Sequence, residues 1–328
     1  MKFVAMLMLS VSWLHSQTEE KAEVSRRVPV DGQLPAYRPA EKFSGQKFKI
    51  EGSGVMATIL TPMAERFVAI HRETEIDLSY PSSAAVFDGL MEGRITFAAM
   101  SRALTEPEKL AFERKFERKL IEICIALDAL EILVNRFNPV SGITIEQLDA
   151  IYSSAGLRGN APVAVWGDLG MGGSWLNQPI EAYGGGTGWG TTRTFETLVS
   201  LGAESKSTVH QRNIETGIPA AVAKDISAIG YSCLGKRSAE VRSVPVAASN
   251  GSPYVACTAE TLQNGSYPLR RPLYLYIVPE KNGNLLPVVR DFLLFSMSRD
   301  GQIVVSESGM VPLDAKQAAA ERKILLGR

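Results

Sequence analysis

The sequence is poor in the residues on which metal sites and disulfide scaffolds depend. It has three histidines and only three cysteines in 328 residues, and Cys124, Cys233 and Cys257 are widely spaced. Such spacing fits neither a zinc site nor a disulfide framework, so we expect no metal and no cofactor. In an oxidising compartment Cys233 and Cys257 could form a bridge; buried free thiols are the alternative.

The sequence also lacks an excess of charge and a long apolar run. It carries 35 basic and 35 acidic residues, a balance that gives no reason to expect nucleic acid or a membrane surface as partner. Its apolar run at residues 3–14 is shorter than the roughly 18 residues of a membrane span. Lys2 before it and small or polar residues after it are typical of a secretion signal. We therefore expect residues 1–16 to be a signal peptide and the mature protein to be periplasmic or secreted.

Catalytic and nucleotide-binding motifs are missing as well. His71 and His210 are the histidines left after signal removal, and neither belongs to a His-Glu-x-x-His motif or neighbours a Gly-x-Ser-x-Gly elbow. We therefore expect that the protein is not an enzyme. His71 lies near a predicted helix end and is interpreted as a capping or surface residue. The segment 230–236 has P-loop spacing, but Arg237 replaces the required Ser or Thr.

What the sequence does have is a glycine-dense segment at 183–196 that leads into a predicted helix. Its five glycines allow close backbone approach to a ligand, and Thr191 or Thr192 can cap a helix starting near Arg193. A helix N-terminus offers free N–H groups and partial positive charge, which suit an anion. The alternative is a flexible loop with an ordinary cap.

Strands and helices alternate along the first third of the chain. Residues 17–46 are polar and proline-containing and read as an extended N-terminal arm. The patterns then predict strands at 47–50, 76–80 and 95–99 and helices at 56–71 and 84–91, with short polar segments between them. This is the arrangement of an open α/β sheet with a binding crevice at the strand ends.

The mature chain, residues 17–328, is too long for one hydrophobic core, since such cores usually stop growing at about 250–300 residues. Apolar runs near 120–134 and 273–278 could carry the chain between two lobes. We predict lobe 1 from residues 47–131 plus 273–328 and lobe 2 from residues 132–272. Further helices are predicted at 105–119, 145–152, 193–201, 218–224, 285–298 and 301–307.

Several motifs, in order along residues 36 to 313, resemble the periplasmic phosphate-binding proteins of ABC transporters. They are Ala99-Met-Ser-Arg-Ala-Leu-Thr-Glu-Pro-Glu108, Ala126-Leu-Asp-Ala-Leu130, Trp166-Gly-Asp-Leu-Gly170, Ile229-Gly-Tyr231, the segment 264–276 and Met310-Val-Pro-Leu313.

This resemblance implies the type II periplasmic-binding-protein fold. In that α/β fold two lobes, each a mixed sheet flanked by helices, are joined by two hinge crossings and close on a small oxyanion such as phosphate. It also implies an ABC transporter permease as partner, and we expect a monomer. The ligand-binding residues that it implies are Gly54, Val55, Ser82, Ser83, Ser101, Gly190 and Thr191. As alternatives, Ser82 and Ser83 would cap a helix, and Ser101 would end a strand.

The chain departs from the family pattern at the ligand loops. Gly185 occupies the position of the family's arginine, Trp189 replaces a serine, and Gly54 and Val55 replace a small polar or acidic residue and a threonine. These losses predict weak binding of inorganic phosphate, unless Arg102, Arg193 or another cation compensates. They also leave a second function open, in which the same fold binds another ligand or acts as a sensor or interaction module.

Overall fold

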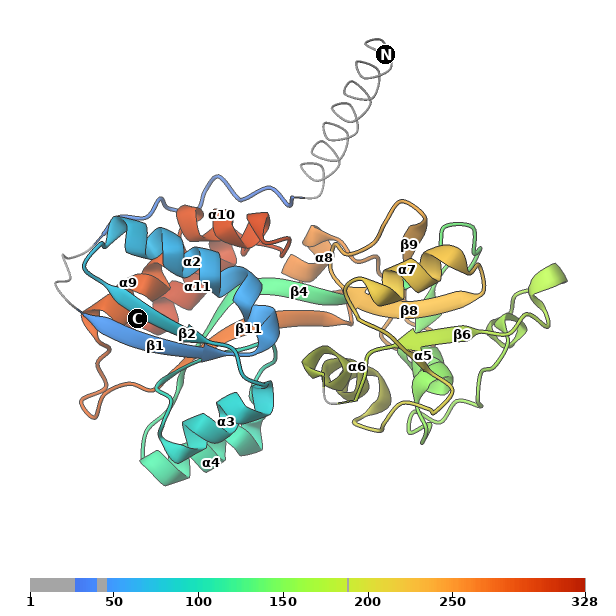
Figure 1. The fold of residues 1–328 in the computed structure, drawn as a ribbon, viewed down its shortest axis with the longest axis horizontal. Coiled ribbons are helices and arrows are strands. Elements are labelled where there is room, and N and C mark those ends of the chain that lie inside the picture. Colours follow the sequence, from blue (N-terminus) through green and yellow to red (C-terminus); the bar gives the residue numbers. More distant parts are fainter. Residues whose placement is uncertain (1–26, 40–45, 188, 328) are drawn as a thin grey trace, which may run out of the picture.

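The computed structural model describes residues 27–39, 46–187 and 189–327. It shows two α/β halves joined side by side by two long strands (Figure 1). The predicted signal peptide, residues 1–16, lies outside the described residues, as do residues 17–26 and 40–45 of the predicted arm. Of the helices in the described ranges, none combines the length and apolar character of a membrane span.

The first half contains both termini of the described chain and a parallel set of three strands, with β1 between β2 and β3. Helices α3 and α4 lie below these strands in Figure 1, and α2, α9, α10 and α11 lie above them. Its elements are β1 (Lys47–Gly52), η1 (Gly54–Met56), α2 (Ala57–Ile70), β2 (Glu75–Ser79), α3 (Ser83–Glu92), β3 (Phe97–Met100), α4 (Glu106–Phe116), α9 (Pro287–Ser296), α10 (Arg299–Glu307) and α11 (Ala315–Leu326).

The second half is built on strands β8, β6 and β7, which run parallel in that order. Its elements are β5 (Ile143–Thr144), α5 (Ile145–Tyr152), η2 (Trp166–Leu169), η3 (Gly173–Trp175), β6 (Glu181–Gly184), α6 (Gly190–Ser200), β7 (His210–Gln211), α7 (Gly217–Lys224), β8 (Ala228–Cys233), β9 (Val241–Val244), β10 (Val246–Ala247) and α8 (Ala259–Gln263).

Strands β4 (Ile121–Asn135) and β11 (Arg270–Ile277) connect the halves. Residues 121–129 of β4 pair antiparallel with β11, and residues 130–135 pair with β8 and β9 of the second half. Strand β11 also pairs with β3 of the first half. The antiparallel pair β4–β11 therefore lies where the two sheets meet.

Each half has its own apolar core. In the first, Phe292 of α9 packs edge-on against Phe67 of α2 at a ring-centroid distance of 5.3 Å. In the second, Phe195 of α6 stacks on Tyr231 of β8 at 3.9 Å. The second core also reaches into the first half, because it includes Leu34 of the arm and Ala318 of α11.

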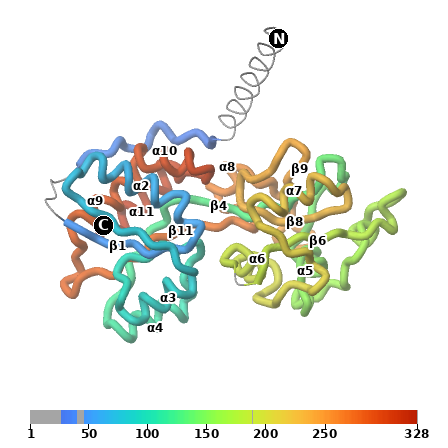
Figure 2. The backbone as a smooth tube through the Cα atoms, in the orientation of Figure 1, coloured from blue at the N-terminus to red at the C-terminus, as the bar shows by residue number. Residues whose placement is uncertain are grey.

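The described part of the N-terminal arm, residues 27–39, crosses the face of the first half near α10 (Figure 2). Its Leu34 is buried, and the backbone N–H of Tyr37 donates to Asp300 at 2.7 Å. The Tyr37 hydroxyl contacts His71 and Asp291, so His71 is buried, at 7% exposure, and its interpretation as a surface residue is wrong.

The remaining sequence predictions agree with the structure in most elements. Helix α5 has the predicted bounds, and the apolar run near 120–134 forms the long strand β4, whereas the sequence predicts neither α8 nor α11. The three cysteines are free, so Cys233 and Cys257 form no bridge; Cys124 and Cys233 are buried and Cys257 is partly buried.

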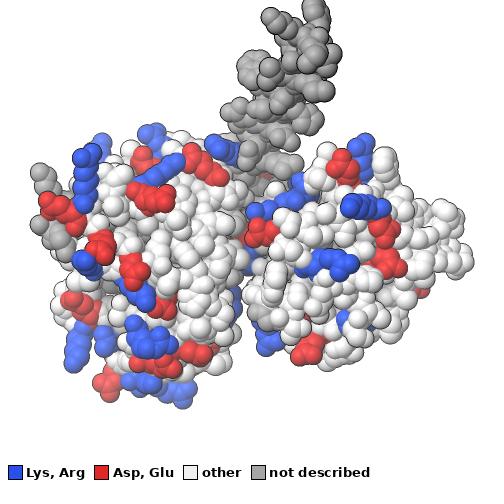
Figure 3. All heavy atoms as spheres, in the orientation of Figure 1, with Lys and Arg blue, Asp and Glu red and all other residues white. Residues whose placement is uncertain are grey.

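Acidic and basic side chains are interspersed over both halves on the face shown in Figure 3, where a groove separates the halves.

Candidate functional site

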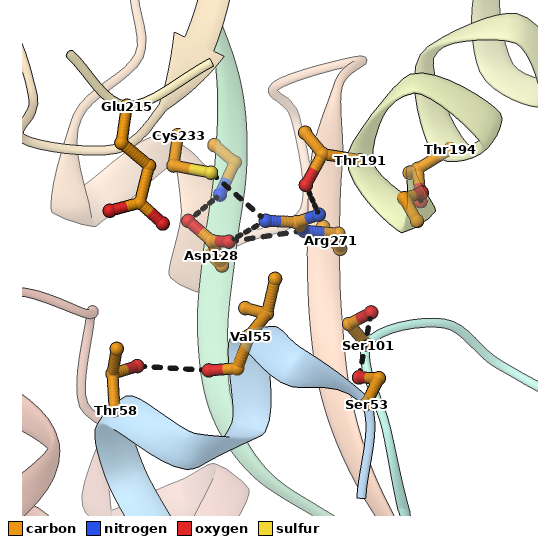
Figure 4. Close-up of polar contacts among 12 residues, drawn as sticks. Ser53, Val55, Thr58, Ser101, Asp128, Thr191, Thr194, Glu215, Cys233 and Arg271 are labelled. Carbon is orange, nitrogen blue, oxygen red and sulfur yellow. Dashed lines mark hydrogen bonds and ion pairs between the residues drawn. The ribbon is translucent and has the colours of Figure 1, made fainter. Parts of the chain in front are cut away.

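The junction between the halves gathers polar residues from six elements. The first turns of η1 and α2 and the end of β3 contribute from the first half, α6 contributes from the second, and β4 and β11 run through the middle (Figure 4). Except for β4 and β11, these segments are strand ends or helix starts, where backbone and side-chain donors are available.

On the first half, Ser53 and Ser101 form a buried pair of hydroxyls. Ser53 follows β1 and Ser101 follows β3, and the Ser53 hydroxyl donates to the Ser101 Oγ at 3.2 Å. The two strand ends approach closely because Gly52 has no side chain, and a Cβ there would lie 3.2 Å from that of Ala99. Because the Ser101 oxygen accepts this bond, its own hydrogen is available to a ligand.

Ser82 and Ser83 lie at the start of α3. The Ser82 side chain accepts from the Ala85 N–H at 3.3 Å, so Ser82 is the N-cap that the alternative interpretation proposed. Ser83 faces the second half, since a Cβ added at Gly190 would lie 3.8 Å from its Oγ. The structure therefore brings Ser83 and Gly190, two predicted site residues from opposite halves, close together.

On the second half, α6 begins three residues earlier than predicted. It starts at Gly190 with Trp189 as N-cap, and Thr191 and Thr192 lie buried in its first turn, so the predicted capping by either threonine is wrong. The first helical bond joins the Arg193 N–H to the Trp189 carbonyl at 3.0 Å. The amides of residues 190–192 thus precede the helical ladder, in the position from which helix N-termini donate to anions.

The glycine loop before α6 is tightly packed at Gly185. Its N–H donates to the Tyr231 hydroxyl at 3.0 Å, and burial raises the pKa of that phenol. A Cβ at Gly185 would lie 2.2 Å from the Thr192 hydroxyl oxygen and 2.6 Å from Ile214. The backbone here therefore has no room for an arginine side chain at position 185 without rearrangement.

Gly54 and Val55 occupy the first turn before α2. Gly54 is exposed, with nothing within 4 Å of a Cβ built on it. Val55 is partly buried and points toward the Arg271 and Asp128 side chains (Figure 4). Its carbonyl accepts from the Thr58 hydroxyl at 2.9 Å. Val55 therefore presents two methyl groups at the position where the resemblance implies a threonine hydroxyl.

The structure reveals a buried ion pair that sequence reasoning missed. Arg271 of β11 donates through Nε to the Asp128 carboxylate of β4 at 3.0 Å, and its Nη2 contacts the same oxygen. The two side chains are 1% and 0% exposed. Burial alone would lower the pKa of Arg271, but the adjacent Asp128 outweighs it and raises the pKa, so the guanidinium is charged.

The free side of the Arg271 guanidinium points to the predicted site. Its Nη1 donates to the Thr191 Oγ1 at 3.3 Å, and its Nη2 contacts the Cys233 sulfur at 3.6 Å. A signal for this pair was present in the sequence, because a carboxylate inside an apolar strand such as β4 requires a partner. The sequence could not indicate which of the 35 basic residues it is.

The two arginines that sequence reasoning considered as substitutes are engaged elsewhere. Arg102 forms a two-bond pair with Glu108 of α4, at 2.6 and 2.7 Å, and this bonding raises the pKa of Arg102. Arg193 is 70% exposed on α6, 3.9 Å from Glu196. Of the three arginines, Arg271 is the one in contact with a predicted ligand residue.

Trp189 lies at the start of α6 and is 47% exposed. Its indole folds back toward the loop, since a Cβ added at Gly186 would lie 3.7 Å from the indole nitrogen. The side chain makes no capping bond to α6. The residue that replaces the family's serine is thus a large ring with substantial contact to solvent.

The described part of the chain contains no cluster of three or more His, Cys, Asp or Glu side chains that could hold a metal ion. The arrangement at the junction instead offers hydroxyls, amides and one guanidinium, which together suit a small oxyanion.

Comparison with known proteins agrees with this geometry. Residues 32–300 match the family model described as the PBP superfamily domain, which makes the chain a PBP superfamily protein. The phosphate-binding protein PstS of Pseudomonas aeruginosa is 33% identical over 290 residues, covering 88% of this chain and 90% of the relative. This chain therefore belongs to the same family as PstS.

Solved structures give the same fold. A possible phosphate-binding protein from Planctomyces limnophilus has a TM-score of 0.69 at 21% identity, covering 87% of this chain and 99% of that one. A putative phosphate ABC transporter substrate-binding protein with bound phosphate from Clostridium perfringens has a TM-score of 0.61 at 26% identity, covering 82% and 100%. The predicted two-lobe type II fold is thereby confirmed.

Proposed function

We propose that this protein binds inorganic phosphate in the groove between its halves and delivers it to an ABC transporter. The observation that carries the proposal is that hydroxyls from both halves face the junction. Ser101 and Thr191 lie on either side of the Arg271 guanidinium (Figure 4), and Ser83 lies beside Gly190. The relatives named as phosphate-binding proteins support the choice of phosphate among oxyanions.

The site chemistry favours capture rather than turnover. The hydroxyl partner of Ser53 is Ser101, and that of Thr191 is Arg271. Neither partner can accept a proton as a general base, so these hydroxyls serve as donors and not as nucleophiles. We therefore propose a binding protein and not an enzyme. The proposed ligand set combines Ser83, Ser101 and Thr191 with the amides near Gly54, Val55 and Gly190, while Ser82 caps α3.

We propose that the two lobes, residues 47–131 plus 273–328 and residues 132–272, close on the ligand by bending within β4 and β11. A ligand that contacts both lobes favours the closed form. Small-angle scattering of the mature monomer should show a smaller radius of gyration when phosphate is added. An unchanged profile at saturating phosphate would indicate a rigid scaffold.

Export is part of the proposal and rests on residues 1–16, whose sequence is that of a secretion signal. N-terminal sequencing of protein from the cell-envelope fraction should begin near Gln17. Recovery of chains that retain Met1 from the cytoplasm would contradict export.

Isothermal titration of the mature protein tests the central claim. Phosphate should bind, and Thr191→Val should weaken binding at least about 10-fold, because the variant loses one charge-assisted donor worth about 1.5–3 kcal/mol. Thr197→Val is the matched control, since Thr197 lies on the same helix, is exposed and donates to the Arg193 carbonyl. If phosphate gives no heat of binding and an unrelated solute binds, the proposal is wrong. The protein would then be a member of this fold that binds another ligand.

A further inference from the structure

We propose that Arg271 is a positioning residue for the bound anion and acts through Thr191. The inference rests on the proposed function, because it concerns the same phosphate site. It assigns a task to a residue of β11 that belongs to neither ligand loop.

The first step is the hydrogen-bond geometry of Thr191. A hydroxyl has one hydrogen and two lone pairs, and a guanidinium has only donors. Because Arg271 Nη1 donates to the Thr191 oxygen at 3.3 Å, the threonine hydrogen cannot point back at the arginine. It is left to donate to another acceptor. The guanidinium thus turns a rotatable hydroxyl into a donor directed away from β11.

The second step is the rigidity of the arginine itself. Two of its nitrogens, Nε and Nη2, are held by one oxygen of Asp128, and the other oxygen of Asp128 accepts from the Ala129 N–H at 2.7 Å. This fixes the guanidinium plane and leaves Nη1 on the side of Thr191. Both side chains are buried, where a hydrogen bond from a charged donor is stronger than in water.

The third step compares Arg271 with the other positions from which the sequence predicts an arginine at the site. An arginine at position 185 would require Thr192 and Ile214 to move, since its Cβ would lie 2.2 and 2.6 Å from their side chains. Arg102 is paired with Glu108, and Arg193 is mostly exposed. Arg271 reaches the start of α6 from β11, so a guanidinium contacts the predicted site although its charge is balanced by Asp128.

The test is a double-mutant cycle of phosphate affinity with Arg271→Lys and Thr191→Val. Lysine keeps the charge but not the planar fork that reaches Asp128 and Thr191 together. Each single variant should lose at least about 10-fold in affinity, a difference of 1.4 kcal/mol. In the Thr191→Val background, Arg271→Lys should lower phosphate affinity little further. In the Thr191→Ser background, which keeps the hydroxyl, it should lower phosphate affinity by the same factor of about 10 as in the unaltered protein.

Unfolding by urea, measured on each variant, shows that affinities are compared between folded proteins. If Arg271→Lys does not fold, the same cycle is run with Asp128→Asn, which frees the guanidinium from its two-bond contact. Equal losses in all three Thr191 backgrounds would mean that Arg271 has only a structural role, and would overturn the inference while leaving the proposed function intact. No phosphate binding by the unaltered protein would overturn both.

Discussion

The two halves contribute to the junction in different ways. The first half offers hydroxyls at the strand and helix ends, with Ser101 buried beside Ser53 and Ser83 directed at the second half. The second half offers the bare backbone of the glycine loop and a single buried pair of threonines, of which Thr191 meets Arg271. The buried charged pair, Arg271 with Asp128, lies on the two strands that connect the halves. In the proposed site the guanidinium is therefore supplied by the hinge strand β11 and not by a ligand loop.

The largest effect is expected at the contact that joins the two halves. Asp128→Ala leaves the buried Arg271 charge without its carboxylate, which should cost about 3–5 kcal/mol of unfolding free energy. Glu75→Ala is the control, because its pair with Lys47 is 64% and 69% exposed and such pairs contribute about 0–1 kcal/mol. Urea unfolding measures both. A loss below about 1 kcal/mol for Asp128→Ala would mean that water or another group can compensate Arg271.

The next effect compares Gly185 of the second half with Gly54 of the first. Gly185→Ala should destabilise by about 1–3 kcal/mol, because its methyl group would meet Thr192 and Ile214 well inside contact distance. Gly54→Ala should change stability by no more than about 0.5 kcal/mol, since the space around it is open. Equal losses of unfolding free energy in the two variants would show that the loop around Gly185 relaxes readily and that position 185 could hold a larger side chain.

Sequence patterns predicted most of the fold because its elements are local. The apolar spacing of α2 and the capping residues of α3 and α5 lie within a few residues of the helices that they define. The start of α6 was placed too late, because Trp189 gives no capping signal and the two threonines after Gly190 do. Helix α11 was missed because its apolar face is weak, with only Ala318 and Leu325 buried.

The candidate site could be predicted only in part, for a related reason. Ser101 and Thr191 come from short motifs that can be recognised in the sequence. The pairing of Asp128 with Arg271 joins residues 143 positions apart, and it depends on the antiparallel register of β4 and β11. No periodicity in either strand encodes that register. The crowding at Gly185 likewise depends on Ile214, which follows a separate strand, β7.

A smaller effect is expected from the helix caps at the two sides of the groove. Ser82 caps α3 with its side chain, whereas Trp189 makes no such bond to α6. Ser82→Ala should therefore lower the unfolding free energy by about 1 kcal/mol, and Trp189→Ser should raise it by a comparable amount. Thermal unfolding measures both changes. If Trp189→Ser destabilises the protein, the indole contributes packing to the loop that outweighs the missing cap.

The smallest effect is a pH dependence confined to the first half. Burial lowers the pKa of His71, and the nearby Asp291 carboxylate partly opposes that shift by raising it. The imidazole contacts the Tyr37 hydroxyl at 2.7 Å and Asp291 at 3.3 Å, and so helps to hold the N-terminal arm on α2 and α9.

Because the folded pKa of His71 lies below the unfolded value of about 6.5, the unfolded chain binds the proton more readily in acid. Its contribution to stability is therefore full above that value and is lost as the pH falls below it. His71→Gln keeps a polar group near Tyr37 but cannot titrate. Urea unfolding at pH 7.5, 6.5 and 5.5 should show the unaltered protein losing more stability than the variant. Parallel decline of the two proteins would assign the acid sensitivity to other groups, and would leave His71 as a purely structural contact of the arm.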